Sequence, residues 1–299
     1  MNSRKILIYA CYVLLAIWII FPIYSIALYS FMPEIETLAA PTHWIPDNPN
    51  IDAYILVLGG KGKGGETWLG GRPLAQSEPF KYGLLNSAIV ATATTLIAVL
   101  VSSCGAYAFA RFNFRARNAW LVSLLFSRML PATAMIIPYY VMFATWRLIG
   151  THIGMIITYL ALSIPLATWI LIGYFSSLPV DVEKAARIDG CGRLETLFRV
   201  VIPMAGSGLA SVAVIVWLLS WGEFLFALVL SAGTPAQLMP PTLTAFLAPL
   251  VVQYPTYAAA ATMISLLPVI VVATVFQRYI TRVKIVDPMV ITVEKGPLA

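Results

Sequence analysis

The stretch IGMIITYLALSIPLATWILIGYFS, residues 153–176, decides the class of fold because it runs for 24 residues without a charged side chain. An α-helix needs about 20 mainly apolar residues to cross a bilayer. Irregular backbone cannot face lipid, so this stretch is predicted to be a membrane-spanning helix. Five other apolar runs have a similar length, which gives six predicted spans, at 6–28, 84–110, 120–145, 153–176, 207–231 and 257–277.

The composition agrees with a membrane protein. Sixty per cent of the residues are hydrophobic and 11% are charged, whereas a soluble domain carries about 25% charged residues. The predicted fold class is therefore an all-α, polytopic membrane protein. Arg4 and Lys5 precede the first run, as they would in a signal peptide. That run is 23 residues long, but the apolar part of a signal peptide is roughly 7–15, so we expect a retained first span.

Lysine and arginine fall mainly on one side of the predicted spans. With the N-terminus in the cytoplasm, 13 lie in inner segments, 5 lie in outer segments and Arg128 lies within a span. The positive-inside rule then predicts that both termini are cytoplasmic. Because topology accounts for the net charge of +6, the charge indicates no nucleic-acid partner.

The predicted spans divide the chain into four parts. Residues 1–28 hold the first span, 29–83 form a periplasmic loop, 84–282 form a core of five spans, and 283–299 form a cytoplasmic tail. The outer loop is rich in glycine between residues 59 and 73, which indicates a turn-rich surface segment that could contact a soluble partner. No Gly-Lys pair in it is followed by Ser or Thr, so it does not match a Walker A phosphate loop.

Cysteine and histidine give no sign of metal or redox chemistry. Cys11, Cys104 and Cys191 are odd in number and widely spaced, which suggests neither a disulfide framework nor a metal site. His43 and His152 fall in predicted outer segments, with no cluster of cysteines or carboxylates beside them in the sequence. We therefore expect no metal site, no cofactor bound by this chain and no enzymatic activity.

The loop after the fourth predicted span, LPVDVEKAARIDGCG at residues 178–192, has the signals of a short helix. Ser177 is a candidate N-cap, and Pro179 suits a first turn. Asp181 and Glu183 then fall near the positive end of the helix dipole. Gly190 is placed to end the helix because it tolerates a left-handed conformation.

A second helix is predicted directly after that turn, ending near Pro203. Its apolar residues recur at i, i+3, i+4 and i+7, which predicts one apolar face: Leu194, Leu197, Phe198 and Val201. One interpretation of the loop at 178–203 is an amphipathic connector resting on the lipid headgroups. The other is a rigid docking element, in which Ala185 and Ala186 keep one patch thin enough for close approach.

The residue pattern of this loop is specific. It resembles the EAA loop of ATP-binding-cassette (ABC) import permeases at Glu183, Ala185, Ala186, Asp189, Gly190 and Ile202-Pro203. Three further stretches are similar to the carbohydrate-uptake branch, in particular to the smaller permease of maltose-type importers: 85–87, 128–132 with 137–138, and 220–228. The chain departs from the family pattern at Cys191, Ile202, Gly222 and the tail beyond residue 283.

The resemblance implies a permease subunit that moves a sugar or polyol inward by alternating access, in a bacterial or archaeal inner or plasma membrane. It implies three protein partners besides membrane lipids: a second permease, a cytoplasmic ATPase dimer that uses ATP and Mg²⁺, and a periplasmic or lipid-anchored solute-binding protein. It also implies that the ATPase docks on a coupling helix between spans four and five, with coupling residues Glu183, Ala185, Ala186, Asp189 and Gly190.

Two ionisable residues lie at predicted membrane depth, Arg128 in span three and Glu223 in span five. Charges inside a membrane are costly and usually face the bundle or a wet cavity. They could pair across a solute pathway, or serve helix packing or subunit contact instead. Aromatic faces of the kind that sugars stack on come from Trp217, Trp221 and Phe224, so these five residues are the candidates for the translocation pathway.

Two other functions remain open from the sequence. An ABC permease for another solute class, such as glycerol phosphate, amino acids or peptides, would share the EAA loop. A secondary transporter would need no ATPase, and such proteins usually show internal repeats, of which none is evident here.

Overall fold

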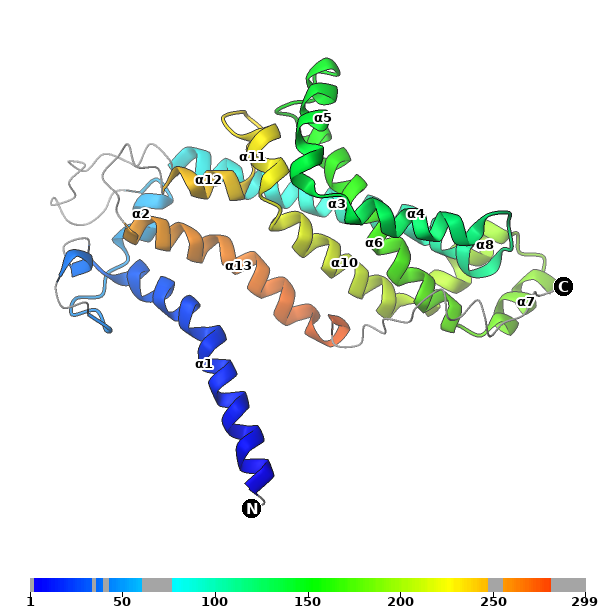
Figure 1. Ribbon diagram of the computed structural model, residues 1–299, viewed down its shortest axis with the longest axis horizontal. Coiled ribbons are helices and arrows are strands. Elements are labelled where there is room, and N and C mark those ends of the chain that lie inside the picture. Colours follow the sequence, from blue (N-terminus) through cyan, green and yellow to red (C-terminus); the bar gives the residue numbers. More distant parts are fainter. Residues whose placement is uncertain (1–2, 34–35, 40–42, 61–76, 247–254, 281–299) are drawn as a thin grey trace. The chain divides into compact units, whose positions relative to one another are not determined.

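The computed structural model of the chain describes residues 3–33, 36–39, 43–60, 77–246 and 255–280 (Figure 1). Regular structure in these residues is entirely helical, which confirms the all-α prediction. The predicted tail at 283–299 and most of the glycine-rich stretch lie outside the described residues. The chain forms two compact units, Met1–Leu84 with Pro241–Pro268, and Leu85–Pro240 with Val269–Ala299.

Among the described residues, the first unit contains three whole helices and parts of three others. The whole helices are α1 (Ser3–Phe31), η1 (Glu36–Leu38) and α2 (Asp52–Val57). The partial ones are the start of α3 (Ser77–Arg111), most of α12 (Met239–Ala245) and the first half of α13 (Pro255–Ile280). The most apolar window of α1 has no buried residue. An apolar helix of this length whose side chains remain unburied is suited to contact with lipid.

The segment that follows α1 folds back against that helix. The hydroxyl of Tyr24 donates to the carbonyl of Trp44 at 2.7 Å, and the ring of Phe21 lies 6.2 Å from that of Trp44. Further along, the hydroxyls of Ser30 and Tyr54 are hydrogen-bonded at 2.7 Å, which ties α2 to the end of α1. These contacts hold residues 43–54 near one end of the first predicted span.

The second unit contains the remaining helices. They are most of α3, α4 (Arg117–Met129), α5 (Ala132–Thr145), α6 (His152–Ser177), α7 (Val180–Ile188), α8 (Arg193–Thr196), η2 (Leu197–Val201), α9 (Ile202–Met204), α10 (Gly206–Trp221), α11 (Leu225–Ser231) and the second half of α13. Helix α6 packs against α4 and α10 (Figure 1). The buried core that these helices share with α3 includes Ala106, Ala167, Leu171, Phe175 and Val212. Small residues at such contacts let helix backbones approach closely in a membrane.

Four of the predicted spans are continuous helices long and apolar enough to cross a membrane. They are Leu7–Phe31, Ser77–Arg111, His152–Ser177 and Pro255–Tyr279, at the positions predicted for spans one, two, four and six. Proline lies inside several of these helices without ending them, as at Pro22, Pro165 and Pro268.

The third predicted span, 120–145, is two helices rather than one. Helices α4 and α5 meet at an angle of 92° around Leu130 and Pro131. The ring of a proline disfavours helical backbone at the residue before it, and Leu130 is extended, with φ −67° and ψ 127°. The second proline, Pro138, lies inside α5 and does not break it.

The fifth predicted span, 207–231, is also interrupted. Helix α10 ends at Trp221 and α11 begins at Leu225. The carboxylate of Glu223 accepts hydrogen bonds from the backbone N–H groups of Phe226, at 3.1 Å, and Ala227, at 3.0 Å. An acidic side chain in this place satisfies N–H groups that a helix start leaves free. Glu223 therefore precedes and supports the start of α11 instead of lying within one long helix.

The polar residues near the start of the second predicted span have a structural role. The side-chain amide of Asn86 donates to the carbonyls of Pro235, at 3.0 Å, and Gln237, at 2.9 Å. The hydroxyl of Ser87 accepts from the backbone N–H of Met239 at 2.8 Å. The stretch at 85–87 therefore fastens the segment that follows α11 to α3.

Candidate functional site

Helix α7 occupies the loop that carries the family resemblance, and its first turn contains Asp181 and Glu183. The cap position before it is Pro179, with no side-chain cap. The prediction that Ser177 caps this helix is wrong, because Ser177 is the last residue of α6 and its hydroxyl donates to the carbonyl of Tyr174 at 2.7 Å. Leu178 is extended and separates the two helices.

The end of α7 agrees with the prediction. Gly190 adopts the left-handed conformation, with φ +92°. Its N–H donates to the carbonyl of Arg187 at 3.1 Å, and the N–H of Cys191 donates to that of Ala186 at 3.0 Å. This pair of bonds is the Schellman motif, which stops a helix at a left-handed residue. The atypical Cys191 fits the motif because only its backbone takes part.

Glu183 is buried and held by the end of α3. The Nε and Nη2 atoms of Arg111 lie 2.7 Å and 2.6 Å from its Oε1 atom. The hydroxyl of Tyr107 donates to Oε2 at 3.3 Å, and Arg111 also donates to the carbonyl of Leu178 at 3.4 Å. Glu183 is therefore paired with a basic group of the same chain. Nothing in the sequence pattern singled out Arg111 or Tyr107 for this role.

The other resemblance-carrying residues lie at the surface. Ala185, Asp189 and Gly190 are exposed, and Ala186 is half-buried. No atom lies within 4 Å of the position that a Cβ on Gly190 would occupy. The α7 surface also exposes Ile188, of which 86% is accessible. The loop thus buries Glu183 and exposes small residues together with Ile188 and Asp189.

The segment after Gly190 is helical, but it does not have the single apolar face that was predicted. Leu197 and Val201 are buried, whereas Leu194 and Phe198 are exposed. The reason is that residues 197–201 form a π-helical turn, η2, between α8 and α9. A π turn closes hydrogen bonds one residue further along the chain than an α turn does, so the α-helical spacing no longer places all four residues on one side.

Arg128 and Glu223 line one cavity of about 150 Å³, together with Tyr159, Leu162, Ser163, Leu219 and Ser220. The structure thus brings together the two charged residues that the sequence assigned to a pathway. Among the described ion pairs none joins them. Arg128 instead donates to the carbonyl of Leu162 at 2.7 Å, while the Glu223 carboxylate is engaged by α11.

One lining group of this cavity is unsatisfied by the described residues. The hydroxyl oxygen of Ser220 is buried and has no hydrogen-bond partner among them. Buried polar atoms in proteins nearly always have a partner, whether protein or water. The cavity therefore offers a hydroxyl, a guanidinium and a carboxylate to a polar occupant.

The three aromatic candidates lie outside the lining of the cavity. The rings of Trp217 and Trp221 stack on each other, 5.0 Å apart and 15° from parallel. Trp217 also donates to the hydroxyl of Thr92 at 3.3 Å, and Trp221 is buried. Phe224 is exposed. Each of these two rings therefore covers one aromatic face of the other.

The sequence suggested that no carboxylate cluster lies near His43, but the structure differs. Folding of the outer segment brings Glu36 and Asp47 to its ring. Linear distance in the sequence hid this group, since seven residues separate Glu36 from His43.

The chain is similar to known transport proteins. Residues 95–284 match the family described as the binding-protein-dependent transport system inner membrane component. A diacetylchitobiose uptake system permease of Streptomyces coelicolor is 30% identical over 91% of this chain and 84% of its own length. A trehalose/maltose transport system permease of Thermococcus litoralis is 29% identical over 93% of this chain and 94% of its own.

The fold has a counterpart among solved structures. A bacterial ABC transporter involved in the import of the acidic polysaccharide alginate contains a chain that matches with a TM-score of 0.75 and 23% identity. The match covers 93% of this chain and 98% of that chain. The fold is therefore that of an ABC transporter permease. The chain belongs to the family of binding-protein-dependent transport system inner membrane components, and it is a multi-pass membrane protein.

Proposed function

We propose that this chain is the permease subunit of a sugar importer and that α7 is the coupling helix on which a separate ATPase docks. The coupling role is supported by the different burial of the residues of α7. Glu183 is buried on Arg111, while Ala185, Asp189 and Gly190 face outward. One side of the helix is thus fastened to a long apolar helix, and the other side is free to enter a cleft of a partner.

This arrangement suits the transfer of motion. When the ATPase dimer closes on ATP and Mg²⁺, a docked α7 moves as a rigid body. The ion pair with Arg111 passes that movement to α3, and the contact of η2 residues with the core passes it to α6 and α10. ATP hydrolysis belongs to the partner in this proposal, and this chain binds no nucleotide, metal ion or organic cofactor for it.

The proposed topology has six spans. Each of two bent helix pairs counts as one span: α4 with α5, bent by 92°, and the helices of Arg193–Met204 with α10, bent by 83°. Both termini then lie in the cytoplasm, in agreement with the lysine and arginine distribution. The predicted periplasmic loop at 29–83 faces the solute-binding protein, and a second permease completes the pathway.

The proposal of a sugar or polyol rests on two supports. The names of the two relatives specify uptake of trehalose and maltose and of diacetylchitobiose. The cavity beside α10 presents Arg128, Glu223 and the unpaired Ser220 hydroxyl, groups that can exchange hydrogen bonds with solute hydroxyls. A thermal-shift screen of the cognate solute-binding protein should give its largest shifts with sugars or polyols. Shifts with amino acids, peptides or glycerol phosphate alone would overturn the assignment.

The coupling role can be tested with Gly190→Val in the complete importer, reconstituted in liposomes. A residue with a Cβ in the left-handed region costs about 1–2 kcal/mol, so the loop should lose its helix-stop geometry. We expect ATP hydrolysis to continue while solute uptake per ATP falls by about tenfold, the factor that corresponds to 1.4 kcal/mol.

The matched control is Gly192→Val. This glycine also has no neighbour within 4 Å of an added Cβ, but its φ of −67° suits any residue. Uptake per ATP should therefore stay near that of the unmodified importer. Normal coupled transport by Gly190→Val would rule out α7 as the lever.

A further inference from the structure

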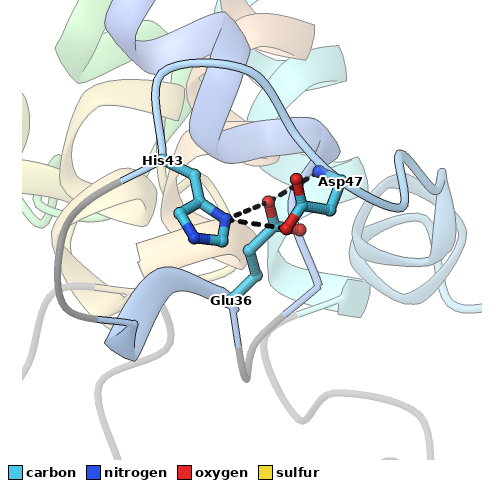
Figure 2. A group of neighbouring side chains, drawn as sticks. All are labelled: Glu36, His43 and Asp47. Atoms are coloured by element: carbon cyan, nitrogen blue, oxygen red, sulfur yellow. Dashed lines mark hydrogen bonds and ion pairs between the residues drawn. The ribbon is translucent and has the colours of Figure 1, made fainter.

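The segment between α1 and α2 gathers three metal-ligating side chains at one point (Figure 2). Glu36 comes from η1, and His43 and Asp47 come from the loop that follows. The Nδ1 atom of His43 lies 3.1 Å from Oε1 of Glu36 and 3.1 Å from Oδ2 of Asp47. The three donor atoms all lie within 4.8 Å of one another.

Two of the three donor separations are close to those of a zinc site. Zinc binds histidine nitrogen and carboxylate oxygen at about 2.0–2.2 Å, so the donors of a tetrahedral site lie roughly 3.3–3.5 Å apart. The two separations of 3.1 Å differ from that by only a few tenths of an ångström. Three protein ligands leave the fourth position of the tetrahedron for water.

The charges in the group also favour a cation. Two carboxylates converge on one ring nitrogen, and like charges at short range repel each other. The Nδ1 atom of His43 lies 3.1 Å from an oxygen of each carboxylate. A divalent ion bound between the three side chains would balance the charge of both carboxylates.

The site is held by its surroundings. The side chain of Glu36 is only 8% exposed, and its Oε1 atom also accepts the backbone N–H of Asp47 at 2.7 Å. The neighbouring Trp44 is fixed to α1 through Tyr24. Groups that orient ligands in this way strengthen a metal site.

We infer that Glu36, His43 and Asp47 form a binding site for Zn²⁺ or a chemically similar transition-metal ion. Calcium takes six to eight oxygen ligands and magnesium about six, whereas this group offers one nitrogen among three donors. The ion would link Glu36 to His43 and Asp47, close to the end of α1. This site is separate from the proposed transport function, and its failure would leave that function intact.

The test uses the full chain in detergent, purified without a histidine tag, stripped with chelator and titrated with ZnCl₂ alone. Cys11, Cys104 and Cys191 are changed to serine first so that thiols do not contribute. We expect one tightly bound zinc per chain by calorimetry and elemental analysis. His43→Gln should weaken binding by more than about 100-fold, since loss of groups that only support a ligand costs about 10–100-fold. Asp47→Asn provides a second variant if His43→Gln fails to fold.

The matched control is His152→Gln, which removes the other histidine of the sequence. It should bind zinc like the parent chain, because His152 lies in the second unit and is hydrogen-bonded to Asn86. X-ray absorption should show one nitrogen ligand from histidine and the rest oxygen. The inference is overturned if the parent chain binds no zinc, if calcium or magnesium binds more tightly, or if both His43→Gln and Asp47→Asn bind zinc as the parent does.

Discussion

Glu183 gives the clearest lesson at the scale of single residues. The side chains of Glu183 and Arg111 are each 8% exposed, and they form an ion pair between α7 and α3. The net worth of a buried pair is small, but removal of one partner leaves an uncompensated buried charge. The pair therefore fixes how α7 lies against α3 more than it adds to stability.

We predict that Glu183→Gln destabilises the chain strongly. Loss of one member of a buried pair costs about 3–5 kcal/mol, so the melting temperature in detergent should fall by several degrees. Asp181→Asn on the same helix is the control, because Asp181 is 90% exposed in its pair with Lys184 and exposed pairs contribute little.

The double variant Glu183→Leu with Arg111→Met distinguishes loss of the whole ion pair from loss of one partner only. Replacing a buried pair by apolar residues of similar size is often neutral, so this variant should melt above Glu183→Gln. Equal melting temperatures for Glu183→Gln and Asp181→Asn would contradict the buried pair.

Residue patterns predicted the helix stop at Gly190 because a left-handed glycine is a local property of the backbone. They could not predict that Arg111 holds Glu183, since 72 residues separate the two. The same limit applies to Glu36 and His43, which only the fold of the outer segment brings together. Ser177 shows a local ambiguity, because a serine between two helices can end one or begin the other.

At the scale of elements, close contact between α6 and α10 organises the second unit. A Cβ added to Gly208 of α10 would lie 2.6 Å from two ring carbons of Tyr174 in α6. Contacts of real Cβ atoms are essentially never that short. The glycine is therefore needed for the approach of these two helices.

We predict that Gly208→Ala lowers the melting temperature. Adding a carbon to a well-packed contact costs about 1–3 kcal/mol, because the Tyr174 ring or α10 itself must move. Gly206→Ala, two residues earlier, is the control, since no atom lies within 4 Å of its added Cβ. If the two variants melt at the same temperature, α6 and α10 are not packed as tightly as described.

Apolar length predicted the continuous helices well but not the breaks. Pro131 and Pro138 both lie in the third predicted span, yet only Pro131 marks a bend. A proline costs nothing at the start of a helix, where its missing N–H has no partner to lose. Which proline begins a helix depends on packing, and so does the use of Glu223 as a cap for α11.

At the scale of the whole molecule, the proposed orientation in the membrane can be measured with a native residue. Cys191 lies in the loop after α7 and is partly exposed. With Cys11 and Cys104 changed to serine, a membrane-impermeant maleimide should label Cys191 in inside-out vesicles only. The reason is that the lysine and arginine distribution places this loop in the cytoplasm.

The opposite pattern is expected for Lys63→Cys in a chain without other cysteines, because residue 63 belongs to the predicted outer loop. Labelling of Cys191 from the outside would reverse the topology and remove α7 from the reach of any cytoplasmic ATPase.

The π-helical turn η2 carries a consequence for how this loop tolerates insertions and deletions. Residues 197–201 contain one residue more than an α-helical turn would need. Deleting one residue there would restore an α turn and rotate everything on one side of it by about 100° relative to the other. Leu197 and Val201 could then not both stay in the core while α7 kept its place. The number of residues in this turn therefore sets the angle at which α7, the proposed docking helix, leaves the core.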